Sequence, residues 1–135
     1  MSRILFAYDG SPGARRALER LAGIVADGDE VTILNVVPAL TQALASHPDK
    51  RHANQALRET DAADARRALF EKGALSTTQV AEGDPAPVIC GVAARGEYDV
   101  IVMGTRHLHG IHRIARTSVT SYVIRNGPCD VMVIH

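Results

Sequence analysis

Five short apolar runs punctuate the sequence, and segments with a helical pattern separate them. The runs lie at residues 3–8, 31–37, 77–81, 100–103 and 131–134. Four are nearly continuous in apolar residues, as strands buried on both faces of a sheet are, while the half-polar run at 77–81 suits a sheet edge. Strands that alternate with helices predict a parallel sheet with right-handed crossovers and helices on both faces. The expected fold class is therefore α/β, a three-layer sandwich around a five-stranded parallel sheet.

Helix start and stop signals stand between the runs. Ser11 before Pro12 and Asp84 before Pro85 each predict an N-cap and the first residue of a helix, because that position needs no N–H. Gly73 is a candidate C-cap for a helix that begins near residue 54, and glycine 96 is expected to end the next helix. Candidate core positions follow at helical spacing: Ala14, Ala17, Leu18, Leu21 and Val25; then Leu57, Ala65, Ala68 and Leu69; then Val88, Ile89, Val92 and Ala93.

The segment from residue 104 to residue 118 joins the fourth predicted strand to the last predicted helix. It begins at Gly104 and ends at Thr117 and Ser118, which are expected to start that helix. A strand, a glycine, a polar loop and a capped helix form the layout of an anion-binding turn. If the first and fourth strands flank the reversal of strand order, Asp9 and Gly104 face one another there. Between Gly104 and Thr117 there are six cationic or titratable side chains and no acid: Arg106, His107, His109, His112, Arg113 and Arg116.

The charge balance and the apolar pattern exclude several classes of function. Lysine plus arginine and aspartate plus glutamate number 15 each, so no overall positive field would attract nucleic acid or an anionic membrane. No apolar run approaches the roughly 18 residues of a membrane span, and the first residues lack a signal-peptide core. Cys90 and Cys129 are too far apart for a metal motif and are expected as reduced thiols in a cytosolic protein, with a disulfide as the alternative.

Five motifs, in order along the chain, resemble those of the universal stress protein family: residues 4–11, 83–85, 98–106, 118–119 and 128–133. The resemblance implies one domain over residues 1–135, with the Rossmann-like fold of the adenine nucleotide alpha hydrolases and the sheet order 3-2-1-4-5. It also implies a cytoplasmic role in the stress response and a homodimer through the last strand, from Val131 to Ile134. No motif identifies further protein partners.

Nucleotide-binding members of that family carry Gly, two residues, Gly, nine residues, then Gly followed by Ser or Thr. Gly104 and Ser118 match the first and last positions, but His107 and Thr117 replace the other two glycines. Glycine allows positive φ and lets phosphate approach the backbone amides, whereas threonine is bulky and stiff. The implied ligand is ATP or another adenine nucleotide, with Mg²⁺ if it is ATP. The implied binding residues are Ala7, Asp9, Val36, Met103, Gly104, Arg106, His107, Arg113, Arg116, Thr117, Ser118 and Val119.

Alternatives stay open for these residues. The arginines could clamp phosphate through their side chains, or the loop could be a solvated surface segment. Asp9 and Ser118 could contact the nucleotide, or they could only order a turn and cap a helix. The histidines at 107, 109 and 112 could bind a metal, but the adjacent arginines would repel a cation, so no metal site is predicted.

The sequence offers no recognisable catalytic machinery. No glycine-flanked nucleophile elbow precedes a helix, and no pair of catalytic carboxylates can be singled out. We therefore expect a non-catalytic binding or interaction module of the stress response, with weak or absent adenine-nucleotide binding between the first and fourth strands. The alternative is an ATP-binding molecular switch that hydrolyses ATP slowly.

Overall fold

The computed structural model describes residues 1–37, 61–105 and 111–135, and for residues 111–118 the backbone alone. Strands and helices alternate along the described chain, as the sequence predicts. The strands are β1 (Arg3–Ala7), β2 (Glu30–Val37), β3 (Leu75–Glu82), β4 (Val100–Gly104) and β5 (Asp130–Ile134); the helices are α1 (Pro12–Ile24), a helix over residues 61–71, α3 (Pro85–Arg95) and α4 (Ile111–Asn126). None of the described helices is long and apolar enough to span a bilayer.

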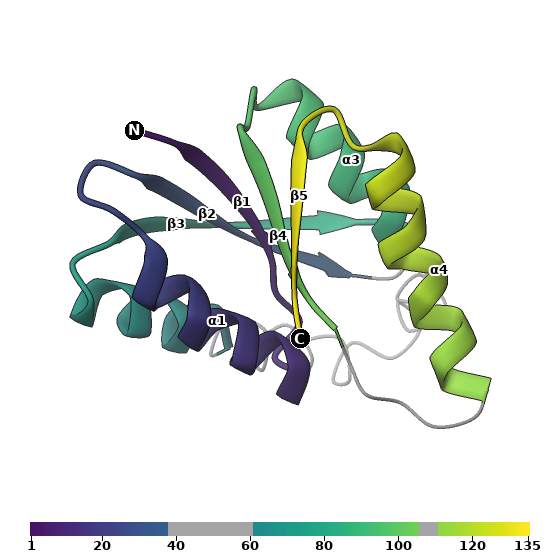
Figure 1. The fold of residues 1–135 in the computed structure, drawn as a ribbon, viewed down its shortest axis with the longest axis horizontal. Helices are drawn as coiled ribbons and strands as arrows, with labels where there is room; N and C mark the ends of the chain where they lie inside the picture. Colours follow the sequence, from purple (N-terminus) through teal and green to yellow (C-terminus); the bar gives the residue numbers. More distant parts are fainter. Residues whose placement is uncertain (38–60, 106–110) are drawn as a thin grey trace, which may run out of the picture.

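The five strands form one parallel sheet in the order β3-β2-β1-β4-β5, which confirms the predicted topology. β1 lies at the centre and pairs with β2 on one side and β4 on the other. Figure 1 shows α1 and the 61–71 helix on one face of the sheet and α3 and α4 on the other. The predicted three-layer α/β sandwich is therefore the observed architecture.

Side chains alternate between two hydrophobic cores, one on each face of the sheet. Ile4 and Phe6 of β1 point into the core under α1 and the 61–71 helix, whereas Leu5 packs in the core beneath α3 and α4. The predicted core positions Ala65 and Leu69 are fully buried in the first of these cores. Because both faces of the sheet are covered, its central strands are apolar at almost every residue.

The helix starts predicted at Pro12 and at Pro85 are both observed. Ser11 is the N-cap of α1 and accepts a hydrogen bond on its Oγ from the N–H of Ala14 at 3.2 Å, with Pro12 next in the chain. Asp84 is the N-cap of α3 and precedes Pro85, but its side chain makes no capping hydrogen bond. Proline after the cap thus marks the helix start in both places.

The predicted helix ends are also observed. Gly73 follows the 61–71 helix with a φ of +87°, and its N–H bonds the carbonyl of Phe70 while the N–H of Ala74 bonds that of Leu69. This pair of bonds is a Schellman motif, which requires the left-handed conformation that glycine adopts without strain. Gly96 is the C-cap of α3. The predicted helix start near residue 54 and the candidate core position at residue 57 lie outside the described residues.

The start of the last helix differs from the prediction. α4 begins at Ile111, so Thr117 and Ser118 lie inside it and Ser118 is not its N-cap. No glycine or proline stands between Ile111 and Asn126, so nothing in the sequence interrupts helical bonding upstream of Thr117. Because interior N–H groups of an α-helix bond carbonyls four residues back, the amides of residues 117 and 118 are held within α4.

Candidate functional site

The strand order reverses between β1 and β4, which places a candidate site at their carboxyl ends. From β1 the chain moves outward through β2 to β3, then crosses back to β4 and on to β5. Ala7 at the end of β1 pairs in register with Met103 of β4. Asp9, shortly after β1, and Gly104, the last residue of β4, therefore lie at the ends of two neighbouring strands, as predicted, at the position where α/β sheets bind ligands.

The turn between β1 and α1 is built around Gly10. Its φ of +75° lies in the left-handed region that favours glycine. Asp9 accepts the N–H of Ser11 on Oδ1 at 3.0 Å, so its carboxylate orders the turn, as aspartate commonly does after a strand. The same residue is exposed. Asp9 thus has the turn-ordering role, and it stands at the end of β1 where a ligand would bind.

Gly104 brings the end of β4 against the first turn of α1. A Cβ built on it would lie 2.5 Å from the carbonyl oxygen of Gly13 and 3.1 Å from the nitrogen of Ala14. Both neighbours are backbone atoms and cannot swing aside as a flexible side chain could. The structure therefore gives Gly104 a packing role. The next residue, Thr105, donates its N–H to the Ile134 carbonyl at 2.9 Å and continues the contact with β5.

Four of the predicted binding residues are apolar and gather on one face of the sheet. Met103 is part of the core beneath α3 and α4, and Ala7, Val36 and Val119 pack against that core. Met103 is buried, while the other three are half-buried. The structure thus places these residues, from three strands and α4, against the same core, with Ala7, Val36 and Val119 only partly covered.

A polar cluster on the opposite face of the sheet was not predicted from the sequence. Tyr8 is buried there, and Arg15 of α1 interacts with its side chain closely enough to act on the pKa of the phenol. Burial raises the pKa of Tyr8, Arg15 lowers it, and the carboxylates of Asp61 and Asp64 raise it further. Asp61 also lies over the turn, since a Cβ on Gly10 would fall 2.5 Å from its Oδ2. These contacts join distant parts of the chain, so no local pattern signals them.

The carboxylates near Gly10 and the apolar residues at the strand ends together determine what the end of β1 can bind. The carboxylates of Asp9 and Asp61 on either side of Gly10 accept hydrogen bonds and repel anions. Hydroxyl or amino groups of a ligand are therefore favoured there over phosphate. The apolar surface formed by Ala7, Val36, Met103 and Val119 suits a flat, uncharged ring. A nucleoside has both features.

The basic residues expected to hold phosphate are described only in part. Residues 106–110, which include Arg106, His107 and His109, lie outside the described chain. The backbones of His112, Arg113, Arg116, Thr117 and Ser118 lie in α4. In the described ranges, no group of three or more His, Cys, Asp or Glu side chains could hold a metal ion.

The family of the chain follows from a comparison over its whole length. The sequence model of the universal stress protein family matches residues 1–135. The chain belongs to this family. As a universal stress protein, it is 31% identical over 137 residues to a relative of the same name from Synechocystis sp., and the match covers 97% of this chain and 83% of the relative.

Solved structures have the same fold as this universal stress protein. One is a family member from Arabidopsis thaliana with AMP bound, which matches with a TM-score of 0.77 at 20% identity, over 99% of this chain and 91% of that one. Another is the universal stress protein from Archaeoglobus fulgidus in complex with dAMP, with a TM-score of 0.76 at 19% identity, over 100% and 98% of the two chains. At these identities the likeness shows the fold.

The cysteines of this universal stress protein do not resemble a nucleophilic centre. Cys90 and Cys129 are free thiols, and both are half-buried against the core beneath α3 and α4. Burial raises the pKa of both thiols, and the charges of Asp130 and Asp99 raise that of Cys129 further. A thiol with a raised pKa forms little thiolate near neutral pH and is a poor nucleophile.

Proposed function

We propose that the protein is a cytoplasmic, non-catalytic module of the stress response that binds an adenine nucleotide weakly at the carboxyl ends of β1 and β4. Membership of the universal stress protein family supports the role in the stress response. The AMP and dAMP bound by two proteins of the same fold support an adenine nucleotide as the ligand. Both of those ligands carry a single phosphate.

The nucleoside part of such a ligand has suitable residues in this chain. The adenine ring lies on the apolar surface of Ala7, Val36, Met103 and Val119. The exposed Asp9 accepts a hydrogen bond from the ribose, since its position at the end of β1 is next to that surface. These two contacts supply the base and sugar recognition of the proposed site.

The early start of α4 is the observation that carries the proposal of weak binding. A phosphate cradle needs free backbone N–H groups at a helix start, but the amides of residues 117 and 118 are committed to the helix that begins at Ile111. The side chains of Arg106, Arg113 and Arg116 are left as the candidates for phosphate contact. The affinity then depends mainly on the nucleoside, and AMP is the preferred test ligand.

The alternative is a switch that binds ATP with Mg²⁺ and hydrolyses it slowly. Such a switch must hold the β- and γ-phosphates and the metal in a fixed geometry, which in nucleotide-binding folds is largely the work of backbone amides. The committed amides of α4 disfavour that arrangement. We therefore rank the weak nucleoside-monophosphate site above the switch.

Isothermal titration calorimetry with AMP and with MgATP tests the proposal. We expect both nucleotides to bind with similar affinity, because the second and third phosphates gain few contacts. Asp9→Asn keeps the acceptor for the Ser11 amide but removes the charge, and it should weaken AMP binding about tenfold. Asp27→Asn, which removes a charge from the exposed turn after α1, is the matched control and should leave the affinity unchanged.

Two results would decide against this function. The absence of heat up to millimolar AMP would rule out nucleotide binding altogether. Much tighter binding of MgATP than of AMP, together with release of phosphate over hours, would favour the switch instead.

A further inference from the structure

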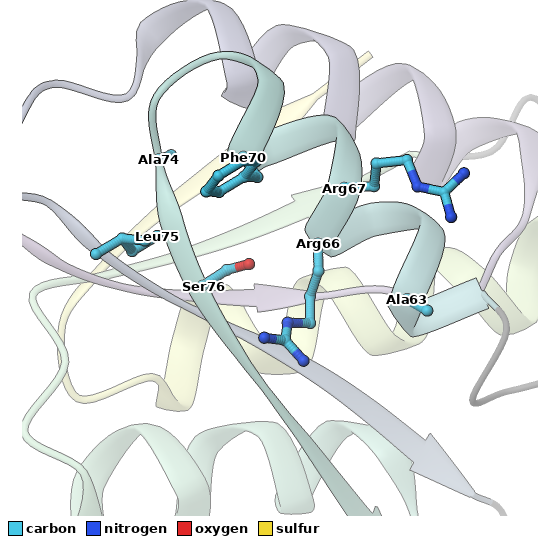
Figure 2. A pocket seen from close by; sticks show the side chains of 7 residues that line it. All are labelled: Ala63, Arg66, Arg67, Phe70, Ala74, Leu75 and Ser76. Carbon is cyan, nitrogen blue, oxygen red and sulfur yellow. The ribbon is translucent and has the colours of Figure 1, made fainter.

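A hollow on the outer edge of the sheet lies apart from the nucleotide site, because β3 is separated from β1 by β2. It has a volume of about 280 Å³ and lies between the 61–71 helix and the start of β3 (Figure 2). The residues that line it are Ala63, Arg66, Arg67, Phe70, Ala74, Leu75 and Ser76. The helical ones among them are Ala63, Arg66, Arg67 and Phe70, and they span about two turns on one flank of the helix. The adjoining flank, with Ala62, Ala65 and Leu69, is buried.

β3 lacks the features that normally protect an edge strand. In the described part of the sheet it pairs with β2 alone, over the eight residues Leu75–Glu82. An unpaired edge is a template for another strand, and natural edges are usually blunted by lysine, proline or a short length. This strand contains no lysine, arginine or proline, and its single charge, Glu82, comes at the end. Among the residues that the structure describes, none pairs with the outer side of its backbone.

Exposed apolar side chains follow this edge. Phe70 is 70% exposed, Leu75 73% and Val80 59%. Phe70 and Leu75 both line the hollow and form its apolar part, whereas Val80, five residues after Leu75, faces the other side of the sheet from Leu75. Phe70 and Leu75 provide contacts for the apolar side chains of an added strand.

The charged side chains that line the hollow indicate which group of a partner it would bind. Figure 2 shows the Arg66 side chain extending from the helix toward β3, on the side where the Ser76 hydroxyl lies, while Arg67 points away. The seven lining residues include two arginines and no acid. A guanidinium group beside a hydroxyl favours a carboxylate, to which it can donate two hydrogen bonds.

We propose that this edge is a docking site for an extended, acidic segment of a partner protein. The segment adds to β3 as a sixth strand, places a carboxylate on Arg66 and packs an apolar side chain on Phe70. Strand addition takes its affinity from main-chain hydrogen bonds and its specificity from such side-chain pockets. A second copy of β3 is less complementary, because it offers one acid, Glu82, and that acid lies at its end.

Labelled synthetic peptides test the proposal with the intact protein. The probes are ten-residue fluorescein peptides of alternating valine and threonine, in which one pair of glutamates is moved stepwise along the strand to sample every register. Matched peptides carry glutamine in place of glutamate. We expect fluorescence anisotropy to show that at least one glutamate peptide binds about tenfold more tightly than its glutamine match. Hydrogen exchange should slow in residues 75–82 and not in residues 130–134.

Variants of exposed residues locate the contact without threatening the fold. Arg66→Gln should lower the affinity for the best glutamate peptide about tenfold, to that of the glutamine match. Arg20→Gln, a change of the same kind at an exposed position of α1, should have no effect. Equal binding of both peptide types, an unaffected Arg66→Gln variant or unchanged exchange in β3 would each overturn the proposal. Protection of β3 that rises with protein concentration in the absence of peptide would assign the edge to a second copy instead.

Discussion

At the scale of single residues, Gly104 shows how a motif position can serve the fold. Its hypothetical Cβ meets the Gly13 carbonyl oxygen at 2.5 Å, so Gly104→Ala must push β4 and α1 apart. We expect this variant to lose about 1–3 kcal/mol of unfolding free energy, the usual cost of overpacking. Gly23→Ala is the control, because no atom beyond its own stretch of α1 lies within 4 Å of a Cβ built there, and alanine should stabilise α1 by about 0.5–1 kcal/mol. Equal urea midpoints for the two variants would contradict the packing role.

Asp29 gives a second prediction at this scale, in the pH dependence of stability. Hydrogen bonds from the backbone N–H of Ala26 at 2.9 Å and of Ser2 at 2.8 Å hold the pKa of this carboxyl below its ordinary value. Its folded pKa is the lower one, so its contribution to stability is present above the unfolded pKa of about 3.9 and is lost as pH falls through the folded pKa. Asp29→Asn should therefore lower the melting temperature at pH 7, and the deficit should shrink on acidification.

Removal of a second charge from the same turn tests whether the pH-dependent change in melting temperature is specific to Asp29. Asp27→Asn removes a charge two residues earlier, and we expect its melting temperature to follow that of the unsubstituted protein across the pH range. A deficit for Asp29→Asn that stays constant from pH 7 to pH 3 would argue against the two backbone hydrogen bonds as its cause.

Single residues were predictable from the sequence where their role is local. Ser11, Pro12 and Gly73 act on neighbours within a few positions, and the structure confirms their helix-capping roles. The sequence assigned Gly104 to a phosphate-binding motif. In the structure its close contact is with the backbone of α1, which is distant in the sequence. The interaction of Arg15 with Tyr8 and the approach of Asp61 to the turn after β1 arise only when the layers pack, so no spacing rule could anticipate them.

At the scale of elements, α4 departs furthest from the sequence-based expectation. The hydroxyl pair at residues 117 and 118 has the composition of a helix start, and the polar residues before it suggested a loop. Composition is a weak guide here, because arginine and isoleucine at 111–116 are compatible with helix when no glycine or proline intervenes. Strands β1, β2 and β4 were easier to predict, since their nearly continuous apolar runs have no helical periodicity.

The length of α4 leads to a prediction about nucleotide affinity. Thr117→Gly combined with His107→Gly restores the glycine pattern and places in α4 a residue about 1 kcal/mol less favourable than alanine in a helix interior. We expect the helix to start later, freeing amides for phosphate, so that calorimetry shows tighter MgATP binding. His107→Gly with Thr120→Gly weakens the same helix at a position outside the motif and should leave the ATP affinity unchanged. Equal MgATP affinities for the two double variants would show that neither the glycine pattern nor the start of α4 limits phosphate binding.

At the scale of the whole molecule, the sheet has two edges with different surroundings. β3 borders the arginine-lined hollow and carries Val80, whereas β5 carries Met132, which is 41% exposed. Tyr122 and Ile124 of α4 are also exposed, at 40% and 57%. The neutral net charge gives no long-range repulsion between copies. If both edges of the sheet paired with copies, the assembly would be open-ended. We therefore propose self-association at β5 and the partner segment at β3.

This assignment predicts a homodimer through Asp130–Ile134. Met132 is the middle residue of β5, so in a two-fold pairing centred on the strand it approaches its own copy. Met132→Lys would then bring two ammonium groups together and should convert the dimer to a monomer. Light scattering at micromolar concentration measures this directly. Val80→Lys introduces the same charge at the opposite edge, where 59% exposure leaves room for it, and this control should remain a dimer. A monomeric unsubstituted protein would rule out the β5 pairing. A dimer that Val80→Lys dissociates and Met132→Lys does not would move self-association to β3 and exclude the acidic segment from that edge.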